Sequence, residues 1–185
     1  MNSSNAEVAP SSPRELVNNF IAEYKQVEKE SESQEMPWES ETTLKIELET
    51  PLFFEVSISS YAYTGGAHGN SYIKYMVLEK EHGGQIKLDS LLTEDAKENL
   101  VSLGEAAFRM SEDVGEMDLE SAGYWFPENN FYLPDNFLYT SDGLMFIYNP
   151  YEVAAYARGY IEFILPYADI EPLIKEKYRL IPPAT

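Results

Sequence analysis

Three glycines within five residues separate two strand-like runs in the first half of the chain. The segment 64–70 reads Thr-Gly-Gly-Ala-His-Gly-Asn, and it lies between the aromatic and β-branched runs 53–63 and 72–79. Glycine adopts backbone angles that are closed to other residues, so this segment can reverse the chain within a short distance. The pattern therefore predicts that the two flanking strands are antiparallel neighbours.

Three other stretches carry helical signals. Ser12, followed by a proline and by a glutamate three residues on, is a capping box, and apolar residues then recur at spacings of three and four up to Val27. A second helix is predicted from about Thr93, whose hydroxyl can cap it, and a third over 168–178, interrupted early at Pro172. The expected buried face of the second helix consists of Leu100, Leu103, Ala107 and Met110.

Further strands are predicted in both halves of the chain. Residues 43–49 alternate apolar and charged side chains, which indicates a half-buried strand. The sequence Ser-Asp-Gly at 141–143 predicts a hairpin between strands 136–140 and 144–148, and 159–165 supplies one more strand. Strands in groups, with helices between the groups, predict an α+β fold with a mostly antiparallel sheet packed against two or three helices in a single domain.

The composition limits the classes of partner. The chain has 185 residues, with 32 acidic against 13 basic ones and a formal net charge of -19. Phosphate binding depends on clustered Lys and Arg, so this charge argues against nucleic acids and anionic membranes as partners. No apolar run approaches the roughly 18 residues needed to span a bilayer. We expect residues 1–12 to be a flexible polar tether, 13–180 the domain and 181–185 a tail.

The 14 tyrosines, 9 phenylalanines and 2 tryptophans supply the apolar area that disordered acidic chains lack. Most of these rings are expected to fill a sheet face, and the others are suited to a recognition surface. The rings considered are Tyr61, Tyr63, Tyr72, Tyr75, Tyr124, Trp125, Phe126, Phe131, Tyr132, Tyr148, Tyr151, Tyr156 and Tyr160.

The side chains that usually carry catalysis are sparse. Cysteine is absent, and the two histidines, His68 and His82, lie on either side of a predicted strand without the spacing of a metal site. The hydrolase motif Gly-x-Ser-x-Gly is also absent, and 32 acids do not nominate a catalytic pair. We therefore expect no catalytic residues, no metal and no cofactor.

The glycine-rich segment is the most distinctive candidate for binding. It lacks the lysine of a P-loop and is not followed by a helix, which argues against a phosphate cradle. Two interpretations remain open: a turn that His68 holds in place, or a ligand-binding loop. The ligand-binding candidates are Tyr61, Tyr63, Gly65, Gly66, His68 and Gly69.

Two parts of the chain, in this order, resemble a known family. The first is the run 61–69, followed by a strand, the run Gly-Gln-Ile-Lys-Leu-Asp-Ser-Leu-Leu at 84–92 and a helix. The second combines Phe-Leu-Tyr-Thr-Ser-Asp-Gly-Leu at 137–144 with 151–159 and Ile-Leu-Pro-Tyr at 164–167. This order is similar to that of the extracytoplasmic domain shared by PdaC-type peptidoglycan deacetylases and RsiV-type anti-sigma factors.

The resemblance implies a location and a role. It implies an α+β domain in the periplasm or at the cell surface, reached after removal of an export signal and attached by a lipid anchor upstream or by a larger chain. In the RsiV type this domain binds lysozyme, so the expected partner is a basic protein such as lysozyme, or peptidoglycan glycan. The alternative is an envelope hydrolase that acts on cell-wall polysaccharide through a carboxylate pair or His68.

Overall fold

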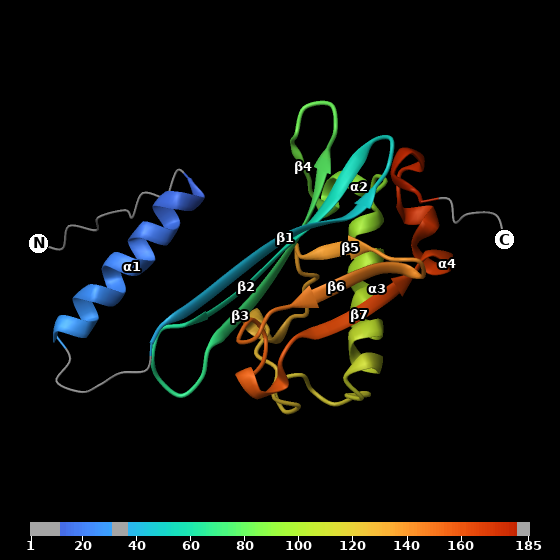
Figure 1. Ribbon diagram of the computed structural model, residues 1–185. Coiled ribbons are helices and arrows are strands. Elements are labelled where there is room, and N and C mark those ends of the chain that lie inside the picture. Colours follow the sequence, from blue (N-terminus) through green and yellow to red (C-terminus); the bar gives the residue numbers. More distant parts are fainter. Residues whose placement is uncertain (1–11, 31–36, 181–185) are drawn as a thin grey trace, which may run out of the picture. The chain divides into compact units, whose positions relative to one another are not determined.

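A computed structural model describes residues 12–30 and 37–180 of the chain (Figure 1). The described residues of 1–41 and 61–70 form one compact unit, and those of 42–60 and 71–185 form a second, larger unit. Apart from Ser12, the predicted tether lies outside the described residues, and so does the predicted tail. Within the described residues, no helix combines the length and apolar character needed to cross a membrane.

Helix α1, Pro13–Glu30, belongs to the smaller unit and begins where the sequence predicts. Ser12 accepts a hydrogen bond from the backbone N–H of Glu15 through its side-chain oxygen, at 3.2 Å, and this confirms the predicted cap. In the same unit, the ring of Trp38 contacts the α1 rings of Phe20 and Tyr24, with centroid distances of 5.7 and 5.8 Å. These three rings tie the helix to the chain that follows it.

Four strands form the first sheet in sequence order: β1 (Glu39–Glu49), β2 (Phe53–Tyr63), β3 (Asn70–Glu79) and β4 (Gln85–Ile86). Strands β2 and β3 are neighbours, as the glycine-rich segment predicts. The half-buried character predicted for 43–49 is wrong, because Leu44 and Ile46 are 64% and 61% exposed. Only Leu48 of that apolar set packs against the core, since only the last part of β1 lies over it.

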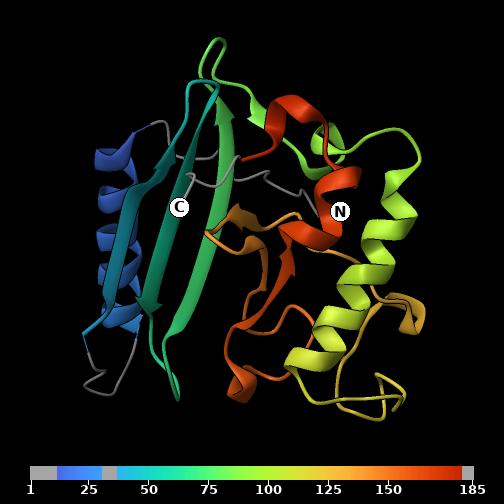
Figure 2. The ribbon, with the colours of Figure 1, turned by 90° about the vertical axis from the view of Figure 1, so that its right-hand side faces the viewer.

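A separate antiparallel sheet contains β5 (Phe137–Tyr139), β6 (Gly143–Tyr148) and β7 (Ile161–Pro166). The described residues thus form two sheets where one was expected, and the α+β class is confirmed. Helix α3 (Ala96–Ser111) packs on β7, and Figure 2 shows the second sheet between the first sheet and α3 in the larger unit. The short helices α2 (Leu88–Leu91) and α4 (Tyr167–Ile170) flank this arrangement.

The core between the second sheet and α3 is built largely from aromatic rings. Phe108, fully buried on α3, is at the centre of this set. Five rings have their centroids between 5.0 and 6.1 Å from that of Phe108: Tyr124, Phe126, Phe131, Tyr148 and Phe163. Most of these pairs meet edge to face, the arrangement that the ring quadrupole favours. Of the 13 rings considered above, Tyr124, Phe126, Phe131 and Tyr148 are buried in this core, which is fewer than the majority expected.

Two helix predictions are wrong in detail. Met110 is 80% exposed, because the buried line of α3 runs through Leu100, Gly104 and Phe108 at intervals of four residues, and Met110 faces elsewhere. Helix α3 begins at Ala96 rather than Thr93, and the Thr93 hydroxyl donates to the carbonyl of Leu173 instead of capping the helix.

The predicted helix over 168–178 is formed only at its start, and its predicted interruption at Pro172 is confirmed. Helix α4 ends at Ile170, and single 3₁₀ turns follow at Glu171–Leu173 and Glu176–Tyr178. Pro172 has no N–H to donate to a continuing helix, which explains the change to a tighter turn at this point.

The predicted hairpin over 136–148 is confirmed, and a threonine organises its turn. The Thr140 side-chain oxygen accepts the backbone N–H groups of Asp142 and Gly143, at 3.2 and 3.1 Å. Gly143 does not need a positive φ here, although the Asp-Gly signal is usually explained in that way. Its requirement is steric, because a Cβ atom at this position would collide with the backbone carbonyl of Leu165 on β7.

We therefore expect Gly143→Ala to lower the free energy of unfolding by about 2–4 kcal/mol, since a backbone carbonyl must move to admit the methyl group. Gly84→Ala is the matched control, because nothing lies within 4 Å of a Cβ built there and the change should cost less than about 0.5 kcal/mol. Urea denaturation of both variants measures the difference. Equal stabilities would contradict the steric requirement.

Candidate functional site

The predicted glycine-rich loop lies in the smaller unit and is held by contacts within itself. The Tyr63 hydroxyl donates to the carbonyl of Gly66 at 3.1 Å, and the Nδ1 atom of His68 lies 2.9 Å from the carbonyl oxygen of Gly69. A Cβ atom on Gly69 would collide with the ring of Tyr61. The structure thus brings five of the six predicted residues into contact with one another.

Gly65, the remaining predicted residue, and Gly66 have φ angles of +100° and +94°, the region that favours glycine. These contacts match the interpretation of the segment as an organised turn. A role in ligand binding stays a prediction, because none of these contacts tests it.

The larger unit carries an open groove that the sequence did not single out as a site. It has a volume of about 380 Å³, which lies in the range of known small-molecule sites. The chain reaches it from three places: strand β3, the segment before β5 and the turn after β6. We call it the tyrosine groove, and its lining residues are Tyr72, Lys74, Asp135, Asn136, Asn149, Pro150, Tyr151 and Glu152.

Two asparagines in the tyrosine groove join the two sheets. Asn136 accepts the backbone N–H of Tyr75 at 2.7 Å and donates to the carbonyl of Ile73 at 2.8 Å. Asn149 accepts the N–H of Ile73 at 2.7 Å and donates to its carbonyl at 3.1 Å. Both side chains are buried, and each amide replaces backbone bonds that a further strand beside β3 would make. This part of the groove is therefore rigid.

Two tyrosines supply the exposed apolar surface of the groove. Tyr72 on β3 is 46% exposed and Tyr151 is 54% exposed. Tyr151 has a φ of +69°, a conformation that is uncommon for a residue with a bulky side chain. Its ring lies against that of Tyr156, with the centroids 5.4 Å apart. The structure thus holds this ring at the surface in spite of an unfavourable backbone angle.

The charged residues of the groove are Lys74, Asp135 and Glu152. Glu152 is fixed at its base, where one carboxylate oxygen accepts the backbone N–H of Asn149 at 2.9 Å. It also accepts a hydrogen bond from Tyr132, whose pKa rises to about 12, first because the phenol is desolvated and second because of the nearby Glu152 charge. The groove therefore presents one cation, two carboxylates and two phenol rings to a ligand.

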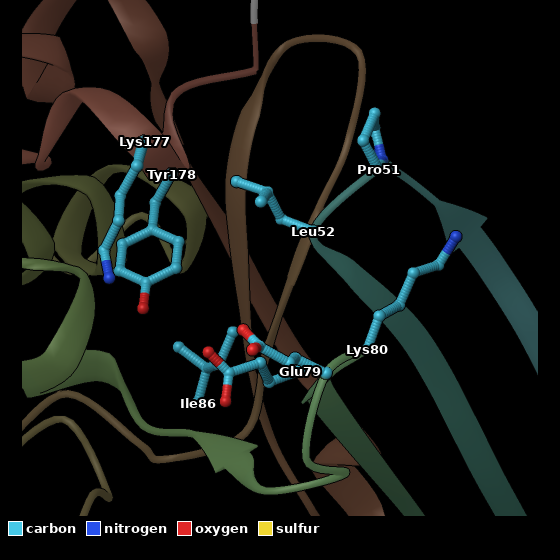
Figure 3. Close-up of a pocket in the computed structure, with 8 residues that line it drawn as sticks. Pro51, Leu52, Glu79, Lys80, Ile86, Lys177 and Tyr178 are labelled. Atoms are coloured by element: carbon cyan, nitrogen blue, oxygen red, sulfur yellow. The ribbon is translucent and has the colours of Figure 1, made fainter.

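A second cavity, of about 310 Å³, lies where the β1–β2 turn approaches the end of the chain's last 3₁₀ turn. Figure 3 shows Leu52 pointing toward the ring of Tyr178, with Lys177 beside that ring and Lys80 directed away. Lys80 is already paired with Glu49 at 2.6 Å and lies over the ring of Phe54. This cavity offers fewer uncommitted polar groups than the tyrosine groove.

Glu55 on β2 is the acidic residue with the most perturbed environment, and sequence reasoning missed it. Its side chain is fully buried between the sheets, where one oxygen accepts the N–H of Tyr139 at 2.6 Å and the other has no partner. Burial raises the pKa of Glu55 to about 7. The apolar run around it suggested a core strand, but nothing in that run marks a buried acid. Because Glu55 has no exposed surface, it does not meet a substrate in this conformation.

The raised pKa makes a prediction about stability. A carboxyl group whose folded pKa lies above its unfolded value stabilises the fold most below the unfolded value of about 4.5, and this contribution is lost as the pH rises through about 7. Between pH 5 and pH 8, the wild type should therefore lose about 2–3 kcal/mol of unfolding free energy relative to Glu55→Gln.

Urea denaturation at the two pH values tests this, with Glu120→Gln, a change at an exposed acid, as the control. Parallel behaviour of wild type and Glu55→Gln across this range would show that Glu55 is not the titrating group.

Among the described residues, no group of three or more His, Asp or Glu side chains is arranged to hold a metal ion. The two histidines have different neighbours. His68 contacts Gly69 in the smaller unit, and Nδ1 of His82 lies 3.6 Å from a carboxylate oxygen of Glu79 in the larger unit.

Comparison with known proteins confirms the family resemblance. Residues 2–71 match the family model "Deacetylase PdaC", and residues 89–168 match "Protein of unknown function (DUF3298)". No curated protein matches the chain. The chain therefore combines a PdaC-like part with a DUF3298-like part.

Two solved structures share this fold. A DUF3298-family protein from Bacteroides fragilis is 24% identical, with a TM-score of 0.72, and one from Pseudomonas aeruginosa is 19% identical, with a TM-score of 0.68. In both cases the alignment covers 90% of this chain and 71% of the other. At this level of identity the likeness concerns the fold, and function has to be argued from the site.

Proposed function

We propose that this chain is a non-catalytic, extracytoplasmic binding or sensing module of the bacterial cell envelope. It recognises a basic protein such as lysozyme, or cell-wall glycan. The observation that carries the proposal is that, in the larger unit, the exposed groove and the perturbed carboxylate lie in different places. The tyrosine groove is open and presents side chains suited to contact, whereas Glu55, the carboxylate with a pKa raised to about 7, is sealed in the core. This geometry favours binding over acid–base chemistry.

The net charge supports a basic protein as one partner. A charge of -19 on 185 residues produces a negative field that attracts cations from beyond contact distance and raises the association rate. The location outside the cytoplasm is supported by the PdaC-like match over residues 2–71. Recognition itself needs contact surfaces, since charge alone attracts every basic protein equally.

The test is a binding titration against lysozyme at physiological salt, with a second basic protein of similar size and charge as the control. We expect saturable one-to-one binding of lysozyme alone. Its affinity should fall by about tenfold when the salt concentration is raised from 50 to 300 mM, because screening weakens the long-range attraction. Equal weak binding of both proteins, disappearing with salt, would reduce the interaction to nonspecific charge and reject lysozyme as a partner.

A further inference from the structure

We propose that the tyrosine groove is a saccharide-binding site that takes neutral pyranose rings. The proposal rests on the proposed binding function, and it specifies the class of sugar that the protein would bind if its partner is cell-wall glycan. It is argued from the groove's shape, its exposed rings and its polar groups.

The exposed rings of Tyr72 and Tyr151 provide the first argument. Each of these residues is about half exposed, at 46% and 54%, whereas the other tyrosines, apart from Tyr61, are buried or half-buried. A pyranose ring has apolar C–H faces and a polar rim, so a flat phenol ring can cover the face while carboxylates and hydroxyls bond the rim. The groove combines both kinds of surface within about 380 Å³.

The polar groups of the groove give the second argument. The carboxylate oxygens of Asp135 and Glu152 are acceptors, the Lys74 ammonium group is a donor, and the tyrosine hydroxyls can act as either. Sugar hydroxyls both donate and accept, so they match this mixed set. The groove's formal charge is -1, from two carboxylates and one ammonium group, and a polyanionic ligand would be repelled by this charge and by that of the whole chain.

The third argument is that the site is preorganised. Asn136 and Asn149 are held by bonds to the backbone of Ile73, Glu152 is held by the N–H of Asn149, and Tyr151 is backed by Tyr156. Little side-chain freedom remains to be lost on binding, and this loss is a main cost of ligand recognition.

Another cavity shares a lining residue with the tyrosine groove. This cavity, of about 250 Å³, shares Asp135 with the groove and is lined by Asp89, Lys97 and Tyr132 among others. Lys97 and Asp89 are paired there at 2.9 Å. Two cavities that share a residue offer room for consecutive sugar units, so the proposed ligand is an oligosaccharide rather than a single sugar.

The test is calorimetric titration of the whole chain with a β-1,4-linked tetramer of N-acetylglucosamine. We expect saturable binding by the wild type and at least a tenfold loss of affinity in Tyr72→Ala and Tyr151→Asn, since each removes one ring surface. Asparagine is chosen at 151 because it tolerates a positive φ and so keeps the backbone conformation. Tyr151→Phe keeps the ring and should retain most of the affinity.

Met110→Ala is the matched control, because it removes an exposed apolar side chain on α3, outside the groove. Urea denaturation of each variant shows whether it folds. Absence of tetramer binding by the wild type, or tetramer binding that the two tyrosine variants leave unchanged, overturns the saccharide site. If lysozyme still binds in that case, the proposed binding function stands without this groove; if the wild type binds neither ligand, both proposals fail.

Discussion

The larger unit depends on the way in which side-chain amides join its two sheets. Strand β3 pairs with β4 only at Val77 and Leu78, and further along β3 the amides of Asn136 and Asn149 bond to its backbone. A buried N–H or carbonyl without a partner would cost about 1–3 kcal/mol. These two side chains therefore satisfy β3 backbone groups that an additional strand would otherwise pair with. Across the same junction, Glu55 of β2 accepts the N–H of Tyr139 on β5.

This junction also explains where the groove is. Asn136 precedes β5 and Asn149 follows β6, so both asparagines stand at the ends of strands, where the chain turns toward solvent. Their neighbours Asp135, Tyr151 and Glu152 are therefore positioned by the same bonds that join the sheets. Because the sheets are joined by side chains rather than by a continuous ladder, the surface stays open between them.

Local signals in the sequence predicted local structure well. The cap at Ser12 and the turn at 141–143 each depend on residues close together in the chain, and both are confirmed. The burial of Glu55 depends on packing partners far along the chain, such as Tyr139. The tyrosine groove belongs to this second kind, since β3 and the turn after β6 meet only in the folded chain. The sequence marks Tyr72 and Tyr151 as rings suited to recognition, but no local sequence pattern indicates that they line the same groove.

The buried carboxylate at the sheet junction shows that this arrangement is kept at some cost in stability. Its one bond to Tyr139 compensates only part of the desolvation, and the second oxygen has no partner. Burial raises the pKa of two nearby phenols, Tyr139 and Tyr167, and the charge of Glu55 raises it further. Tyr139 donates to the carbonyl of Tyr178, and Tyr167 donates to that of Thr140. The acid thus weakens the junction by its own burial, while its bond to Tyr139 joins β2 to β5.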